Sequence, residues 1–221
     1  MLFRHRVLAF AVVVSGCGPG TNRAQTLETI SLDLAPAVAP VDTGHGMVLL
    51  GDSLADQSRG ALAAVVPQLT VDAFVGRTIA EPFLADTGTG RVADLARLNP
   101  TWWIIELGTN DAAFAHHPLE EMRADIVELL DTIGRDACVA WILPAVTAPV
   151  DSAAIDLANG FGLLAVDEVS RLACHAVIHW SETVTAETDV LGPDGVHFTD
   201  HGMERFAALI ADGISRFPIA P

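Results

Sequence analysis

The chain has 221 residues, of which 51% are hydrophobic and 18% are charged, a balance typical of one globular domain with a substantial core. Its formal net charge is −16, from 12 basic and 28 acidic residues. Such an acidic surface repels phosphate backbones, so we expect no nucleic-acid partner.

The first 16 residues have the pattern of a signal peptide. They begin with the basic stretch MLFRHR and continue with the apolar run VLAFAVVV, which is much shorter than the roughly 20 residues that span a bilayer. The letters VSGC then place Cys17 behind a small-residue site. This resembles a bacterial lipoprotein signal, in which the peptide is cut before the cysteine and the thiol is lipidated. An ordinary secretory signal with an incidental cysteine is the alternative.

Residues 17–44 mix glycine, proline and threonine with weak periodicity, and we expect them to be a flexible tether behind the lipidated Cys17. Residues 45–221 then form one domain. The anchor would hold this domain at the outer face of the cytoplasmic membrane or elsewhere in the cell envelope. The remaining cysteines, Cys138 and Cys174, can form a disulfide outside the cytoplasm, and two buried free thiols are the alternative.

Short apolar runs alternate with helical patterns along this domain. We expect helices over 54–66, over the segment with VADLARL, from Pro118 to Gly134, and after a cap at Thr199 or Asp200. The runs predict five buried strands, at 46–51, 69–75, 101–107, 138–146 and 162–166. This alternation predicts an α/β fold with a five-stranded parallel sheet covered on both faces. Ligands of such sheets bind beyond the carboxyl ends of the strands.

The turn GDS after the first strand delivers Ser53 to the start of a helix. Free backbone N–H groups and a partial positive charge at that position favour an oxyanion. A serine there can also be only the N-cap of the helix. The G-x-S-x-G signature of α/β-hydrolases is absent, because residue 55 is alanine.

Two later turns carry further polar side chains. Asn110, in ELGTNDA after the third strand, offers the amide donor that an oxyanion needs, although it could also form only a turn. Asp194 and His197 lie three residues apart in GPDGVHFTDHG, where the carboxylate can hold one ring nitrogen while the other acts as a base. A capping aspartate and a surface histidine are the alternative.

The segments GDSLAD, GTND and DGVH, in this order, with a glycine block after the first, resemble the SGNH (GDSL-type) hydrolase family over residues 46–214. The resemblance implies a three-layer α/β/α, flavodoxin-like fold and a serine esterase or acyltransferase mechanism. It implies Ser53 as nucleophile, His197 as general base and Asp194 as third member of the triad. The oxyanion hole would comprise the backbone N–H groups of Ser53 and Gly76 and the side chain of Asn110.

Gly76 follows the second strand, where the glycine block of the family falls, and Gly88 and Gly90 are weaker candidates in a later loop. The surrounding VDAFVGRT also resembles the equivalent block of family members that move acetyl groups on cell-wall polysaccharides, in which an arginine follows the glycine as Arg77 does here. Because GTND is intact, we expect a hydrolase with water as the acceptor.

We therefore expect an esterase that cleaves short-chain acyl esters, acetyl esters above all, of small molecules or polysaccharides, without a cofactor. A polysaccharide O-acyltransferase and a non-catalytic lipoprotein that binds a glycan or a partner protein are the alternatives. We expect no metal site. His175 and His179 are four residues apart, but no acidic residue lies at a metal-binding spacing from them. We place His116 and His117 in a loop near the cleft.

Overall fold

The computed structural model describes residues 9–10, 30–31, 46–84 and 86–217. The predicted cleavage site, Cys17 and nearly all of the tether lie outside the described residues, so the anchor stays a prediction. Two short strands, β1 (Ala9–Phe10) and β2 (Ile30–Ser31), pair antiparallel. Within the described part of the chain, no helix combines the length and apolarity needed to cross a membrane.

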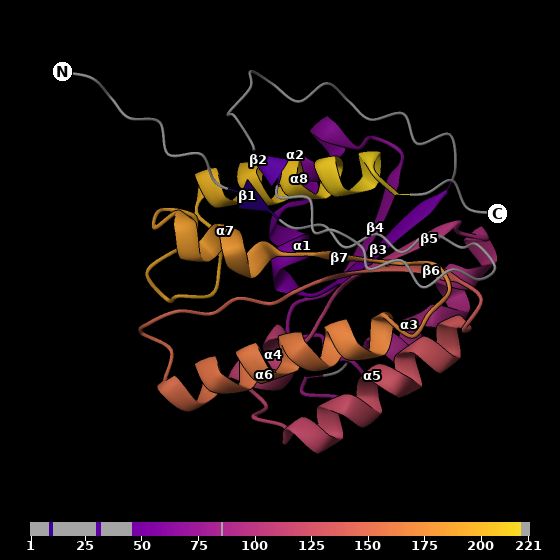
Figure 1. Ribbon diagram of the computed structural model, residues 1–221, viewed down its shortest axis with the longest axis horizontal. Coiled ribbons are helices and arrows are strands. Elements are labelled where there is room, and N and C mark those ends of the chain that lie inside the picture. The colour runs from indigo at the N-terminus through magenta and orange to yellow at the C-terminus, as the bar shows by residue number, and fades with distance from the viewer. Residues whose placement is uncertain (1–8, 11–29, 32–45, 85, 218–221) are drawn as a thin grey trace.

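A five-stranded parallel sheet forms the centre of the domain (Figure 1). In spatial order its strands are β4 (Leu69–Ala73), β3 (Met47–Gly51), β5 (Trp102–Glu106), β6 (Cys138–Ile142) and β7 (His175–Ile178). By sequence this is the order second, first, third, fourth, fifth, which is the flavodoxin-like order. The predicted fold class is therefore confirmed.

Helices cover both faces of the sheet. The bounds are α1 (Ser53–Gln57), α2 (Arg59–Val65), α3 (Gly88–Leu95), η1 (Ala96–Leu98), α4 (Thr109–Ala113), α5 (Leu119–Ile133), α6 (Ser152–Val169), α7 (Trp180–Ala186) and α8 (Asp200–Ser215). Figure 1 shows α2 and α8 on one side of the sheet and α3, α5 and α6 on the other. Right-handed crossovers between parallel strands put the connecting helices on both faces when the strand order reverses direction along the sheet, as it does here at β3.

The predicted helix boundaries at Gly134 and Thr199 are confirmed. Gly134 ends α5 with φ +106°, a left-handed conformation that favours glycine. The Thr199 hydroxyl accepts a hydrogen bond from the Gly202 N–H at 3.0 Å and caps α8.

The prediction of a strand at 162–166 was wrong, because these residues lie within the 18-residue helix α6. The Asp151 side chain caps this helix by accepting a hydrogen bond from the Ala154 N–H at 2.9 Å. Its buried apolar residues recur at helical spacing: Ala154, Ala158, Phe161, Ala165 and Val169. A short apolar run does not distinguish a buried strand from a buried helix, and the fifth strand is instead β7.

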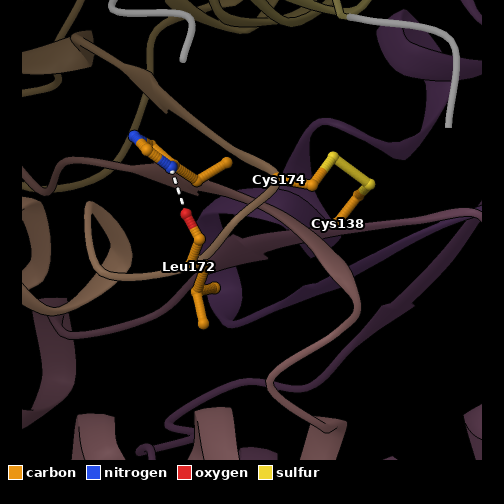
Figure 2. Close-up of a disulfide and its surroundings, with 4 residues drawn as sticks. Cys138, Leu172 and Cys174 are labelled. Atoms are coloured by element: carbon orange, nitrogen blue, oxygen red, sulfur yellow. Dashed lines mark hydrogen bonds between the residues drawn. A yellow bond between two sulfur atoms is a disulfide. The ribbon is translucent and has the colours of Figure 1, made fainter. Parts of the chain in front are cut away.

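Cys138 and Cys174 form a disulfide between the starts of β6 and β7 (Figure 2). The bond lies at the amino-terminal edge of the sheet, because both cysteines precede or begin their strands. Beside it, the His175 ring donates a hydrogen bond through Nδ1 to the Leu172 carbonyl at 2.9 Å. His175 is therefore a buried packing residue.

Candidate active site

Ser53 is the first residue of α1, directly beyond the carboxyl end of β3. The alternative role of Ser53 as the helix N-cap is wrong, because the Asp52 carboxylate caps α1 by accepting a hydrogen bond from the Leu54 N–H at 2.9 Å. The Ser53 hydroxyl instead lies 3.1 Å from Nε2 of His197. The helix cap and the serine hydroxyl thus have separate partners.

His197 and Asp194 both lie in the turn before α8. The Asp194 carboxylate accepts a hydrogen bond from Nδ1 of His197 at 2.7 Å, and its other oxygen accepts the backbone N–H groups of Val196 and His197, each at 3.0 Å. Partial burial acts to raise the pKa of Asp194, but these hydrogen bonds outweigh it and lower the pKa. An ionised Asp194 therefore holds the Nδ1–H tautomer, which leaves Nε2 free to accept the Ser53 proton.

The side chain of Gln57 attaches this turn to α1. Its amide donates a hydrogen bond to the Phe198 carbonyl at 2.9 Å and accepts the Phe198 N–H at 3.0 Å. Because Phe198 follows His197, this two-bond contact fixes the ring relative to Ser53 on the same helix.

Asn110 lies in α4, at the same edge of the sheet. Its Nδ2 donates to a carboxylate oxygen of Asp52 at 2.8 Å and to the Arg77 carbonyl at 3.0 Å. The contact with Asp52 brings the amide close to Ser53. Both of its hydrogens have acceptors, so donation to an oxyanion would replace the contact with Arg77.

The backbone N–H groups of Ser53 and Gly76 can donate to an oxyanion without breaking another hydrogen bond, since neither has an acceptor among the described residues. Gly76 has φ +76°, and a Cβ atom at that position would overlap the side chain of Leu84. Glycine is therefore required there for both conformation and space. Gly88 begins α3, and Gly90 donates its N–H to the Thr87 cap.

Two carboxyl groups are buried beneath the serine turn. Glu106, at the end of β5, accepts the backbone N–H groups of Asp52 at 3.1 Å and Ala55 at 3.3 Å. Burial raises the pKa of Asp52 to about 7, and burial together with the neighbouring Asp52 raises the pKa of Glu106 well above its ordinary value. The pair therefore retains a proton near neutral pH.

Gly51 gives Glu106 access to the turn. A Cβ atom at Gly51 would lie 2.9 Å from the Glu106 carboxylate and 2.5 Å from the Ala55 side chain. The glycine of the GDS turn is therefore needed for close packing.

Arg77 is buried and fully engaged. Its guanidinium donates to the carbonyls of Gly51 at 3.1 Å and Asp72 at 2.8 Å, and pairs with the carboxylates of Asp72 at 2.7 Å and Asp86 at 2.5 Å. It joins the ends of β3 and β4 and positions the carbonyl that Asn110 contacts. The arginine after the glycine is thus a positioning residue in this structure.

The sequence reasoning missed Glu106 and Gln57. For Glu106 a signal was present: a single acid ends the otherwise apolar run TWWIIE, and a buried acid at a strand end needs nearby donors. For Gln57 we find no signal, because one glutamine on an amphipathic helix is ordinary. His179, the other histidine considered for a metal, pairs with Glu182 at 3.3 Å.

No protein-family model matches the chain, and neither does any curated protein. Solved structures share its fold. A lipase/acylhydrolase from Enterococcus faecalis is 19% identical, with 79% of this chain and 97% of that chain covered and a TM-score of 0.64. The C-terminal catalytic domain of peptidoglycan O-acetyltransferase A from Streptococcus pneumoniae is 17% identical, covering 81% and 92%, with a TM-score of 0.60.

An acetyl xylan esterase from Geobacillus stearothermophilus is 16% identical, with 83% of this chain and 99% of that chain covered and a TM-score of 0.62. At these identities the likeness establishes a common fold. The neighbours named here are thus two ester-cleaving proteins and one O-acetyltransferase domain, each aligned over nearly its whole solved chain.

Proposed function

We propose that this chain is a serine esterase of the SGNH (GDSL-type) hydrolase family that hydrolyses short-chain acyl esters, acetyl esters above all, through an acyl-serine. The observation that carries the proposal is the continuous relay from Ser53 through His197 to Asp194, with contacts of 3.1 Å and 2.7 Å. The three residues come from two turns 144 residues apart in sequence that meet at one edge of the sheet. The esterase neighbours support the same reaction class.

The reaction begins when Nε2 of His197 takes the Ser53 proton and the Ser53 oxygen bonds to the ester carbonyl carbon. The carbonyl oxygen becomes an oxyanion, stabilised by the N–H groups of Ser53 and Gly76 and by the Asn110 amide. The carbon–oxygen bond to the alcohol breaks, and the alcohol leaves with the proton from His197. Water then attacks the acyl-serine by the same steps, releasing the acid and restoring the Ser53 hydroxyl.

Apolar side chains support an acyl substrate. The segments on either side of Gly76 expose four of them: Phe74, Val75, Phe83 and Leu84. Since the Leu84 side chain occupies the space where a Cβ atom on Gly76 would lie, an acyl group whose carbonyl oxygen faces Gly76 would lie beside these side chains. A series of p-nitrophenyl esters from acetate to decanoate measures the preferred chain length, and we expect kcat/KM to be greatest for the short esters.

The direct test of the proposal is Ser53→Ala. We expect this variant to fold as the wild type and to lose hydrolysis of p-nitrophenyl acetate. A serine-directed phosphonate should label the wild-type protein at Ser53 and leave Ser53→Ala unlabelled. Absence of labelling in a folded wild-type protein would instead support the alternative of a non-catalytic binding domain.

An O-acyltransferase is the second candidate, favoured by the likeness to the peptidoglycan O-acetyltransferase domain. The two activities share the acyl-serine and differ in whether water or a sugar hydroxyl attacks it. Adding soluble cell-wall oligosaccharides to an acetyl-ester assay separates them. Acetylated oligosaccharide formed in competition with acetate identifies a transferase, and acetate alone identifies a hydrolase.

We further propose that the enzyme acts at the cell envelope, anchored by a lipid on Cys17. The signal-like residues 1–16 and the small-residue site before Cys17 support this placement. Growth with a labelled fatty acid should label the wild-type protein and not Cys17→Ala. Equal labelling, or none in either, would remove the anchor and leave the esterase proposal unaffected.

A further inference from the structure

A second group of titratable side chains lies behind Asn110, apart from the serine relay. Asp111 belongs to α4, His117 precedes α5, and Asp125 belongs to α5. Nδ1 of His117 lies 3.8 Å from a carboxylate oxygen of Asp111 and 3.9 Å from one of Asp125. One ligand atom from each of the three lies within 4.8 Å of the other two.

These side chains are largely buried, and each leaves one polar atom without a hydrogen-bond partner among the described residues. The side chain of Asp111 is fully buried, that of Asp125 is 9% exposed and that of His117 is 19% exposed. One atom in each side chain, Oδ2 of Asp111, Nδ1 of His117 and Oδ2 of Asp125, is buried and has no hydrogen-bond partner among the described residues. Oδ1 of Asp111, the oxygen that lies 3.8 Å from Nδ1 of His117, accepts the Ile79 N–H at 3.1 Å, whereas no described residue donates a hydrogen bond to Oδ2 of Asp125.

An arrangement of this kind is costly without a ligand, because buried polar atoms are nearly always hydrogen-bonded and buried charges are paired. Burial raises the pKa of Asp111 to about 6. Burial likewise raises the pKa of Asp125, with further contributions from the surrounding Glu81, Glu128 and Glu121, although His117 acts in the opposite direction. The nearby carboxylates of Glu81, Glu121 and Glu128 add negative charge to these surroundings, which a cation would offset.

We propose that Asp111, His117 and Asp125 bind a divalent transition-metal ion, for which Zn²⁺ fits the donor set best. Zinc accepts imidazole nitrogen and carboxylate oxygen at about 2.0–2.2 Å, so two of its ligand atoms are roughly 3–4 Å apart. The observed separations from the histidine match this distance. Ca²⁺ and Mg²⁺ prefer sites made only of oxygen, and the unpartnered imidazole nitrogen disfavours them.

The ion would connect three segments directly behind the candidate oxyanion hole. Asp111 follows Asn110 in α4, and its Oδ1 accepts the N–H of Ile79, two residues beyond the Arg77 carbonyl that Asn110 contacts. His117 also donates its backbone N–H to the Asp111 carbonyl at 2.9 Å. Binding would thus stabilise α4, the segment 77–79 and the start of α5 relative to one another. This role is structural and does not depend on the proposed esterase activity.

The proposal is tested by measuring how tightly the full chain binds Zn²⁺. The protein carries no affinity tag and is first freed of metal with a chelator, and binding is measured by calorimetry and by competition with a chromophoric chelator. We expect one Zn²⁺ per chain at this site and a higher unfolding temperature with zinc. His117→Gln and Asp125→Asn should each weaken binding more than about 100-fold, because even indirect partners of metal ligands are worth 10–100-fold. The matched control is His201→Gln, which changes the more exposed group of Glu187, Asp189 and His201 and should bind zinc as the wild type does.

Three results would overturn the proposal: no binding at 100 μM Zn²⁺, unchanged binding in His117→Gln and Asp125→Asn, or loss of binding in His201→Gln alone. X-ray absorption of the zinc-loaded wild type provides a test that needs no variant to fold. It should show nitrogen and oxygen ligands with a single imidazole, and two or more imidazoles, or sulfur, would refute the site. Because none of these measurements uses ester hydrolysis, a failed esterase test and a failed zinc test remain distinct.

Discussion

Replacing Asp194 by asparagine tests the central relay with little change in shape. The asparagine carbonyl can still accept the backbone N–H groups of Val196 and His197, which lie 3.0 Å from Oδ1 of Asp194 in the wild type. The amide group then faces Nδ1 of His197, in place of the carboxylate oxygen at 2.7 Å. A ring that accepts at Nδ1 carries its proton on Nε2, so it donates toward Ser53 and cannot take the serine proton.

We expect kcat for p-nitrophenyl acetate to fall by about 10⁴, which corresponds to roughly 5.5 kcal/mol of transition-state stabilisation. Stability should hardly change, because the Asp194 side chain is 52% exposed, and exposed ion pairs contribute at most about 1 kcal/mol. For a domain of this size that is a Tm decrease of no more than about 2–4 °C. A large decrease in kcat together with a small decrease in Tm would show that Asp194 acts in catalysis and not in folding.

The control for this measurement is Asp200→Asn, which removes an exposed acid from the first turn of α8 and has no contact with the relay. We expect its kcat to match the wild type. The reasoning is refuted if Asp194→Asn retains kcat within tenfold of the wild type while folded. A Tm decrease of more than 10 °C would show instead that Asp194 acts mainly in folding.

Three further substitutions test other parts of the structure. Asn110→Ala should lower kcat by about 10²–10³, and a loss under tenfold in stopped-flow hydrolysis would assign the oxyanion to backbone donors alone. Replacing Cys138 and Cys174 together by alanine should cost about 4 kcal/mol from the closed loop, seen in urea unfolding, and leave kcat unchanged because the disulfide lies at the opposite sheet edge. Glu106→Gln should reduce the pH dependence of stability. The raised pKa of Glu106 means that the folded state holds a proton which the unfolded chain releases above about pH 4.5. The stability of the wild type therefore decreases as the pH rises from about 4.5 toward the raised pKa. An equal decrease in the variant would contradict this.

The local patterns predicted most of the fold. Four strands were predicted in place because their apolar runs are short and are bounded by turns, and Gly134 and Thr199 carry the usual chemistry of helix ends. The error at 162–166 arose where the chain is apolar on more than one face of a helix, since α6 packs on the sheet and also against α5 near Gly160. There the periodicity is weak, and only tertiary packing decides between helix and strand.

The candidate site was predictable where residues act within one turn, and unpredictable where they act across turns. Asp194 and His197 are three residues apart, so their contact follows from spacing alone. The approach of Asp125 to His117 depends instead on where the segment between α4 and α5 lies relative to α5, and nothing in LEEMRADIVELL distinguishes this aspartate from the acids around it. The sequence analysis, which expected no metal, had no means of placing these two side chains together.

One edge of this sheet buries four acidic side chains, Asp52, Glu106, Asp111 and Asp125, although each costs stability there. Asp52 and Glu106 recover part of that cost through backbone N–H groups of the turn that holds Ser53, and Asp52 also accepts the Asn110 amide. The acids therefore act as rigid acceptors that position the nucleophile and an oxyanion donor by hydrogen bonds that apolar packing could not provide. Oδ2 of Asp111 and Oδ2 of Asp125 have no such donor among the described residues, which is why a cation is the partner we infer for them.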